Sequence, residues 1–190
     1  AAAQGKSVLE QLCARMSDEA AVLDYSYSLD MSGMKTTGSG TLTVQGQSYV
    51  MKGNGISIYC NASALWVVDD AGKDVLVDNV AQEMDAALSN PVLLLANLSS
   101  VFSIDSPSRN GLSLIYALSP KTDCGIVSGE VSIDTSGASP VFSSGWFKTS
   151  DGALLDIKIK SMTFVPKKPL TFYTLDISGL DSSWMITDLR

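Results

Sequence analysis

The sequence of 190 residues contains no histidine. Histidine is the commonest general base near neutral pH and the commonest protein ligand of metal ions. Catalytic triads of the Ser-His-Asp and Cys-His types are therefore excluded. The three cysteines, Cys13, Cys60 and Cys124, are far apart and form no C-x-x-C pair, so zinc and thioredoxin-like motifs are absent too. We expect three apolar core thiols, or one disulfide and one remaining thiol, with no bound metal and no cofactor.

Charge is also scarce. Charged residues make up 17% of the chain, against about 25% in an average domain. The 20 acidic side chains outnumber the 13 basic ones and give a net charge of -7. Because phosphate neutralisation needs a basic stripe, we expect no nucleic-acid binding, and anionic lipid headgroups are disfavoured for the same reason.

Long apolar runs are missing as well. The longest, residues 91–96, is far shorter than the roughly 18 residues that span a bilayer. Residues 1–5 lack the charged and apolar regions of a secretory signal, so no signal peptide is expected within this chain. The residues themselves leave the compartment open.

Hydrophobic periodicity predicts a helix followed by many short strands. Residues 6–21 carry apolar side chains at helical spacing, whereas residues 23–31 alternate strictly between apolar and polar. Hairpin-length connections between the strands favour an antiparallel sheet. The predicted strands are 23–31, 40–44, 48–52, 56–60, 65–68, 74–78, 112–118, 129–134, 141–149, 154–163 and 171–177.

Two short helices are predicted between the two blocks of strands, over residues 81–88 and 92–98. Pro91 suits the first turn of the second helix. Leu93, Leu94, Leu95 and Leu98 make this helix apolar on most sides, so it needs cover from both sides or faces a cavity. About eleven strands and three helices, with no linker, predict one domain over residues 1–190.

Paired carboxylates are the remaining candidates for catalysis. Asp69, Asp70, Asp74 and Asp78 flank one predicted hairpin, and Asp181 and Asp188 lie near the C-terminus. Aspartates in turns are ordinarily solvated, and residues 69–74 depart from the spacing of a calcium loop. We therefore expect no catalytic residues and no enzymatic activity.

The surplus of apolar side chains is the more informative feature. Three short helices cover only part of an eleven-stranded sheet, so the sheet must close on itself, dimerise or enclose a ligand; a core filled by its own side chains is the alternative. Alternation along the strands predicts which side chains line an apolar interior. They are Leu23, Tyr25, Tyr27, Leu29, Leu42, Val44, Tyr49, Met51, Ile56, Ile58, Trp66, Val68, Leu93 and Leu94.

Five segments, in order, resemble the periplasmic carriers of outer-membrane lipoproteins, the LolA-like family. Residues 40–52 (GTLTVQGQSYVMK) resemble its early strands, and residues 61–68 (NASALWVV) its turn and tryptophan-containing strand. Residues 90–95 (NPVLLL) are similar to its central proline and leucine helix. Residues 117–121 (ALSPK) and 184–190 (WMITDLR) resemble its Pro-Lys strand and its closing Asp-Leu-Arg.

The resemblance implies a mainly antiparallel, incomplete β-barrel of about eleven strands, with helices as a lid over bound acyl chains. It also implies a non-catalytic transport chaperone in the periplasm of a Gram-negative bacterium, acting in outer-membrane biogenesis. Its implied partners are lipoprotein acyl chains or another lipid, an inner-membrane lipoprotein-releasing ABC transporter and an outer-membrane acceptor. We expect a monomer.

Two positions depart from the family pattern. Family members carry a lid-latching arginine near the positions of Gly46 and Val50, and an Asp-Gly turn where this chain has Asn61 and Ala62. These departures leave a second function open: a non-catalytic envelope interaction or sensor module on the same scaffold, with a filled core.

Overall fold

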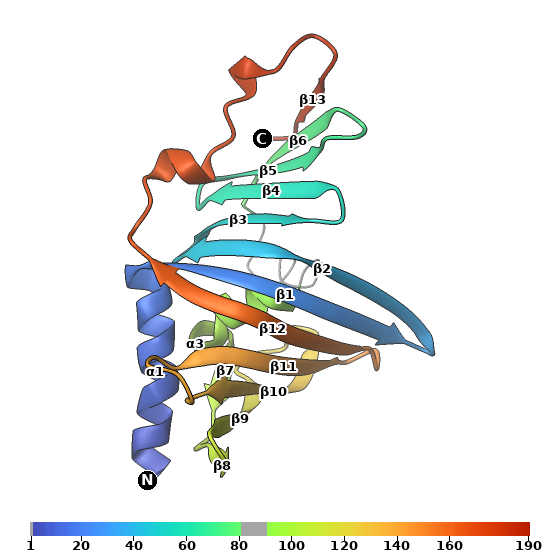
Figure 1. Cartoon of the computed structure of the whole chain (residues 1–190). Coiled ribbons are helices and arrows are strands. Elements are labelled where there is room, and N and C mark those ends of the chain that lie inside the picture. The colour runs from blue at the N-terminus through green and yellow to red at the C-terminus, as the bar shows by residue number, and fades with distance from the viewer. Residues whose placement is uncertain (1, 81–90) are drawn as a thin grey trace.

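A single open sheet dominates the computed structural model, which describes residues 2–80 and 91–190 (Figure 1). Thirteen strands form this sheet within the described residues. They are β1 (Ala20–Met31), β2 (Met34–Gln45), β3 (Ser48–Gly53), β4 (Ile56–Asn61), β5 (Ala64–Asp69), β6 (Asp74–Asn79), β7 (Phe102–Ile104), β8 (Ser108–Asn110), β9 (Ser113–Pro120), β10 (Ile126–Asp134), β11 (Val141–Thr149), β12 (Leu154–Val165) and β13 (Met185–Asp188).

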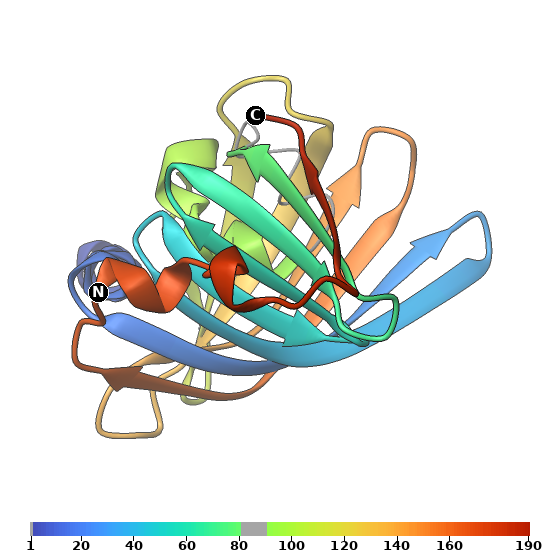
Figure 2. The same ribbon diagram turned by 90° about the horizontal axis from the view of Figure 1, so that it is seen from above.

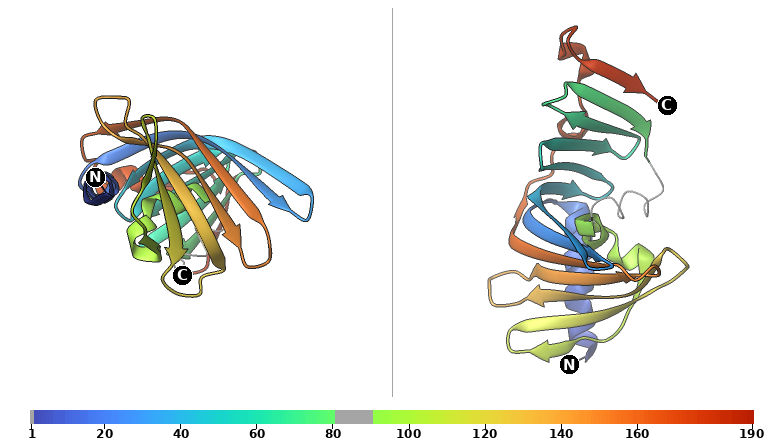
Figure 3. Two further views of the ribbon diagram at one scale, coloured as in Figure 1. Left: turned by 90° about the horizontal axis from the view of Figure 1, so that it is seen from below. Right: turned by 90° about the vertical axis from the view of Figure 1, so that its right-hand side faces the viewer.

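The sheet consists of two antiparallel meanders joined at their first and last strands. Its order is β13-β6-β5-β4-β3-β2-β1-β12-β11-β10-β9-β7, with β8 paired to β9. β1 pairs with both β2 and β12, and the only parallel pair among the described strands is β13 with β6. The two end strands do not pair with each other, so the sheet remains a half-open barrel (Figure 3).

Short helices lie on both sides of the sheet. α1 (Ala2–Asp18) runs across the strands of the second meander. η1 (Pro91–Ala96) and α3 (Leu98–Val101) lie within the curve of the sheet, which we call its concave face (Figure 3). η2 (Leu170–Tyr173) and η3 (Ile177–Gly179) lie along the opposite, convex face of β4–β6, as the view from above shows (Figure 2).

Two apolar clusters hold these layers together. The larger one joins the concave face to α1, η1 and α3, and includes Leu9, Leu23, Leu94 and Phe147. The smaller one lies on the convex face of β5 and β6, under the segment that contains η2, η3 and Trp184.

The structure confirms most of the elements predicted from the sequence. Ten of the eleven predicted strands are present, and the first helix ends at Asp18 because Ala20 already begins β1. The predicted helix over residues 92–98 is a 3₁₀ turn followed by a short α-helix. The predicted helix over residues 81–88 lies outside the described residues.

The strand predicted over residues 171–177 is wrong. This segment forms η2 and a turn, in which the Asp176 carboxylate accepts a hydrogen bond from the Ser178 N–H. Its apolar side chains pack on the convex face of the sheet, so their alternation reflects contact with a surface beneath them, not strand pairing. The strands β7, β8 and β13, of three or four residues each, were not predicted because such short runs carry no clear period.

Candidate functional site: the concave apolar face

The strand register defines a continuous apolar stripe on the concave face. Leu23 on β1 is opposite Leu42 on β2, Leu42 is opposite Met51 on β3, and Met51 is opposite Ile58 on β4. Directly opposed residues of antiparallel strands point to the same side of a sheet. The stripe therefore crosses four strands.

Ten of the predicted interior residues from β1 to β4 lie on this face. Four of them are the residues named above, and alternation along each strand places the other six on the same face. Leu23, Tyr25, Leu42, Val44 and Met51 are at most 4% exposed, and the others are partly buried. The full set on these strands is Leu23, Tyr25, Tyr27, Leu29, Leu42, Val44, Tyr49, Met51, Ile56 and Ile58.

Trp66 and Val68 lie on the convex face, so their predicted interior placement is corrected. Trp66 is opposite Tyr59 and pairs with Val77 of β6, and all three belong to the smaller apolar cluster under the C-terminal segment. Their neighbour Val67 is opposite Ile58 and therefore faces the concave side.

Three residues of β5 and β6 were missed by sequence reasoning. Leu65 and Val67 of β5, and Leu76, which is opposite Val67, face the concave side. Leu76 is 37% exposed and extends the apolar stripe to β6, the neighbour of the end strand β13. Both faces of β5 are apolar in sequence, so alternation does not show which face is the concave one. The orientation of β5 is seen only in the structure, where the C-terminal segment covers Trp66 and Val68.

The leucine-rich segment of η1 and α3 covers the concave face where β1 meets β12, next to the β1 end of the stripe. Leu93 is 4% exposed, and Leu94 and Leu98 are 0% exposed, all within the larger cluster. The two predicted interior leucines, Leu93 and Leu94, thus contact the concave face from the helical side. In the described part of the chain, this end of the concave face is filled by the protein's own side chains.

Two tyrosines of β1 lie over glycines of β2. Tyr25 is opposite Gly40 and Tyr27 is opposite Gly38. A methyl group added at Gly38 would lie 2.6 Å from the Tyr27 ring, and one at Gly40 would lie 3.0 Å from the Tyr25 hydroxyl. Such contacts show that each ring occupies the space a β-carbon would fill, and aromatic side chains cover strand glycines in this way.

An open cleft of about 220 Å³ adjoins these tyrosines on the concave face. Its walls carry apolar side chains, and one rim is polar, at Ser39 and the turn between β3 and β4. Ligand pockets for small molecules usually enclose about 300–1,000 Å³, so this cleft admits a side chain or the end of a chain. Its lining residues are Tyr25, Tyr27, Ser39, Met51, Gly53, Asn54, Ile56 and Ile58.

The position that departs from the family's arginine latch has a backbone role here. Gly46, in the turn between β2 and β3, has a φ of 59°. Its N–H donates a hydrogen bond of 3.0 Å to the carbonyl oxygen of Met16 in α1. The turn thereby holds the end of α1 against the sheet without a charged side chain.

Buried polar groups of the site are few and have raised pKa values. Burial raises the pKa of Tyr49 and of Cys60, which lie opposite each other on β3 and β4. Burial, with a smaller contribution from Glu10, raises the pKa of Cys13 in α1 to about 11. Such thiols and phenols stay protonated and uncharged at neutral pH, as an apolar interior requires.

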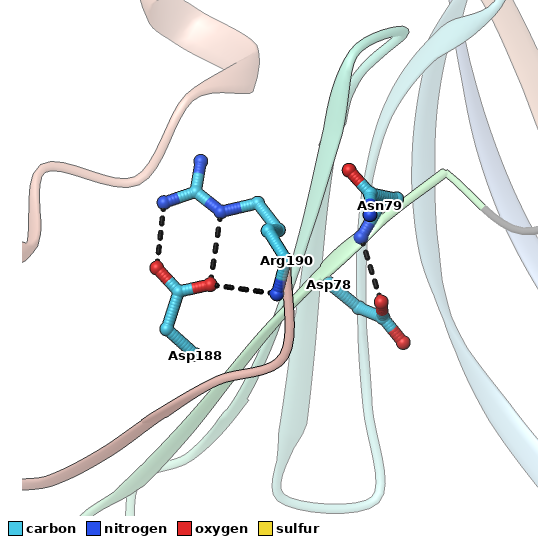
Figure 4. Close-up of polar contacts among 4 residues, drawn as sticks. All are labelled: Asp78, Asn79, Asp188 and Arg190. Carbon is cyan, nitrogen blue, oxygen red and sulfur yellow. Dashed lines mark hydrogen bonds and ion pairs between the residues drawn. The ribbon is translucent and has the colours of Figure 1, made fainter.

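Three of the candidate carboxylates accept hydrogen bonds from backbone N–H groups one to three residues further along the chain. Asp69 accepts a hydrogen bond from the Gly72 N–H, Asp181 accepts from Ser183, and Asp78 accepts from the Asn79 N–H (Figure 4). Asp188 forms an ion pair with Arg190, which lowers the pKa of Asp188 to about 2. A glycosidase acid needs a raised pKa, whereas hydrogen bonds from neighbouring residues lower the pKa of both Asp181 and Asp188. No cluster of potential metal ligands occurs in residues 2–80 or 91–190.

Comparisons with known proteins identify the fold. No protein-family model matches the chain, and no curated protein matches it. A conserved protein from Thermus thermophilus superposes with a TM-score of 0.59 at 7% identity, covering 97% of this chain and 99% of its own. A LolA superfamily protein from Nitrosomonas europaea gives 0.51 at 10% identity, with 90% and 97% covered. A DUF1329 family protein from Desulfovibrio piger gives 0.50 at 10% identity, with 93% and 99% covered.

The protein is thus a half-open antiparallel barrel with short helices. Its fold is LolA-like, at very low sequence identity to the solved structures. The resemblance seen in the sequence is confirmed at the level of the fold. Among the described helices, none combines the length and apolar character needed to cross a bilayer.

Proposed function

We propose that the protein is a carrier that binds acyl chains of lipoproteins, or of other lipids, against the concave face of its sheet. The observation that supports this proposal is the apolar stripe across β1–β4. Leucines of η1 and α3 cover one part of it, and an open cleft bounds another.

The covering leucines give such a carrier reversible binding. Burying each methylene of an acyl chain contributes about 0.8 kcal/mol, so an exposed apolar groove would hold a long chain too tightly. Here an entering chain displaces Leu93, Leu94 and Leu98 from the same surface. Exchanging one apolar contact for another keeps the net free energy of binding small.

The proposed setting is the periplasm of a Gram-negative bacterium, where a monomer would receive cargo from an inner-membrane ABC transporter and deliver it to an outer-membrane acceptor. This part of the proposal rests on the LolA-like fold. The net charge of -7 is consistent with it, because an acidic surface keeps an apolar-lined protein soluble and away from anionic membranes. No catalytic step is proposed.

The proposal is tested by measuring lipid binding to two variants of β4. Ile56 lines the cleft and Ser57, its neighbour, faces the convex side. We expect the parent protein to bind a fluorescent fatty acid and to retain an acyl chain in native mass spectrometry. Ile56→Asp should weaken binding at least tenfold, because a carboxylate in an apolar site excludes the chain. Ser57→Asp, with the same added charge, should bind as the parent does.

Equal binding by both variants would place the chain elsewhere and contradict the proposed site. If the parent binds no acyl chain in detergent, in micelles or after partial unfolding, the carrier function itself is wrong. Circular dichroism of each variant verifies that the sheet is intact.

A second candidate function is the non-catalytic envelope interaction or sensor module. The observation that favours it is the complete burial of Leu94 and Leu98 in a core that the chain fills by itself. In that case the helical segment never leaves the sheet. Hydrogen exchange of residues 92–101 that is unchanged by any lipid would support this function over the carrier.

A further inference from the structure

The outer edge of β2 is only half occupied. β2 pairs with β1 along its whole length, from Met34 to Val44, but its pairing with β3 covers only residues 41–45. Beyond Thr41 the β1–β2 hairpin extends past the turn between β3 and β4 (Figure 1). Residues 34–39 of β2 therefore present an edge without a strand partner in the described structure.

This edge is regular and lightly protected. The β1–β2 register runs without a bulge over the entire hairpin, so its backbone groups keep the spacing of an ordinary strand. Natural edge strands are usually blunted by prolines, bulges or several charges. The edge segment has the sequence MKTTGS, in which Lys35, near the tip, is the one charged residue.

The two sides of the edge differ in chemistry. On the concave side, Gly38 and its covering Tyr27 adjoin the apolar cleft of about 220 Å³. On the convex side lies a hydroxyl-rich groove of about 520 Å³, with Lys35 and Lys158 among its walls. Tyr27, Ser39 and Asn54 line both hollows, which therefore meet along the same stretch of β2.

The lysines of the groove are available to a ligand. Lys35, Asp156 and Lys158 are all exposed, and none of them takes part in an ion pair among the described residues. Two lysines and one aspartate line this groove, and Asp30 lies beside it, opposite Lys35 in the β1–β2 hairpin. Carboxylate side chains are the groups that such a groove recognises.

We propose that the free edge of β2 binds an extended segment of a partner protein as an added antiparallel strand, in line with β3. Strand addition takes its affinity from main-chain hydrogen bonds and its specificity from alternate side chains. Residues of the segment opposite Thr36 and Gly38 would face the cleft and are apolar. Residues opposite Lys35, Thr37 and Ser39 would face the groove, and at least one of them is acidic.

The geometry limits the length of the segment. Six residues of β2 are free, and at about 3.4 Å per residue they span about 20 Å, the length of a common strand. The cleft accepts single apolar side chains, and it is also one part of the surface proposed for acyl chains. Slower amide exchange in residues 34–39 distinguishes an added strand from a bound lipid, because a lipid forms no main-chain hydrogen bonds along this edge.

The test uses a fluorescein-labelled peptide of eight residues that alternates leucine with glutamate, and a second peptide with lysine in place of glutamate. Binding is measured by fluorescence anisotropy, and amide hydrogen exchange locates the contact. We expect the glutamate peptide to bind the parent and to slow exchange in residues 34–39. The lysine peptide should bind at least tenfold more weakly.

Charge reversal supplies the decisive variant. Lys35→Glu combined with Lys158→Glu should lower the affinity for the glutamate peptide at least tenfold and raise the affinity for the lysine peptide. Lys148→Glu combined with Lys167→Glu changes the net charge equally at exposed sites outside the groove, and should leave both affinities within twofold of the parent. Rescue by the lysine peptide shows that the double variant is folded.

Three outcomes would overturn the proposal. The first is glutamate-peptide binding without slower exchange in residues 34–39, which would indicate charge attraction alone. The second is an equal effect of both double variants. The third is a concentration-dependent dimer that protects the same amides without peptide, which would make a second copy of the chain the occupant.

Discussion

At the scale of single residues, two glycines of β2 determine how the side chains of β1 pack on the concave face. Gly38 and Gly40 leave room for Tyr27 and Tyr25, whose side chains pack over β2 and form one wall of the cleft. The two glycines are not equivalent. At Gly38 an added methyl group meets the movable end of a ring, whereas at Gly40 it meets the carbonyl oxygen of Lys52 at 2.3 Å.

Gly40→Ala should therefore destabilise the protein by about 1–3 kcal/mol, as overpacking does where the backbone must shift. Urea unfolding followed by circular dichroism measures this loss. Gly179→Ala is the matched control, because nothing lies within 4 Å of its added methyl group. Equal midpoints for the two variants would show that β2 and β3 are not in close contact at Gly40.

Thiol reactivity gives a second prediction at this scale. With its pKa raised to about 11 by burial and by Glu10, Cys13 is a thiolate in roughly one molecule in a thousand at pH 8, against about a quarter for an ordinary thiol. Burial raises the pKa of Cys60 as well. Both should resist iodoacetamide at pH 8 in the folded protein and react in urea, as peptide mass mapping would show. Fast labelling of the folded protein at either site would contradict this environment.

At the scale of elements, the C-terminal segment acts as a second cover on the sheet. Leu175, Ile177, Leu180 and Trp184 pack over the convex face of β5 and β6, and β13 then pairs with the edge of β6. The N–H of Met185 donates to the Lys73 carbonyl oxygen and that of Leu189 to the Val77 carbonyl oxygen, each at 2.8 Å. One face and one edge of the first meander are closed by the same segment.

Trp66→Ala should reduce the free energy of unfolding by about 3–5 kcal/mol, because it empties the space under this segment. Acyl-chain binding by the folded variant should not change, since Trp66 faces away from the concave side. Ile186→Ser, at a position of β13 that is 41% exposed, serves as a control and should change stability by less than about 0.5 kcal/mol. Loss of lipid binding by the folded Trp66→Ala variant would indicate that Trp66 belongs to the ligand site after all.

The comparison of sequence and structure is also clearest at this scale. Strict alternation, as in β1, predicted both the strand and its inward face, because each polar neighbour excludes the opposite orientation. In β5 the residues between Ala64 and Asp69 are apolar on both faces, and local pattern carries no information on which side is buried. The free edge of β2 could not be predicted from the sequence either. It exists because the pairing of β2 with β3 ends at Thr41, and no local pattern shows where that pairing ends.

At the scale of the whole molecule, acidic groups of the turns make stability depend on pH. Hydrogen bonds from neighbouring residues lower the pKa of Asp134, Asp151, Asp176 and Asp181, and Arg190 lowers that of Asp188 to about 2. An aspartate in an unfolded chain has a pKa of about 3.9. Folding therefore releases protons from these groups, and their contribution is complete above that pH.

The stability that these aspartates provide should be lost as pH falls from about 4 through 2. Urea midpoints measured at pH 7, 4 and 2.5 should decrease chiefly over the last step. Asp188→Asn should show a smaller decrease over that step than the parent, because it lacks the ionisable partner of Arg190. A midpoint that does not change between pH 4 and 2.5 would contradict these pKa shifts.

The pairing of β1 with β12 also sets an order of assembly in time. β2 follows β1 directly in the chain, whereas β12 begins more than 100 residues later. Closing so long a loop costs more conformational entropy than closing a hairpin, so β1 pairs with β2 before it pairs with β12. Until then the first meander exists alone, with β1 exposed at its border. Protection of the unfolded chain by a chaperone matters most at this stage, before the two meanders are joined.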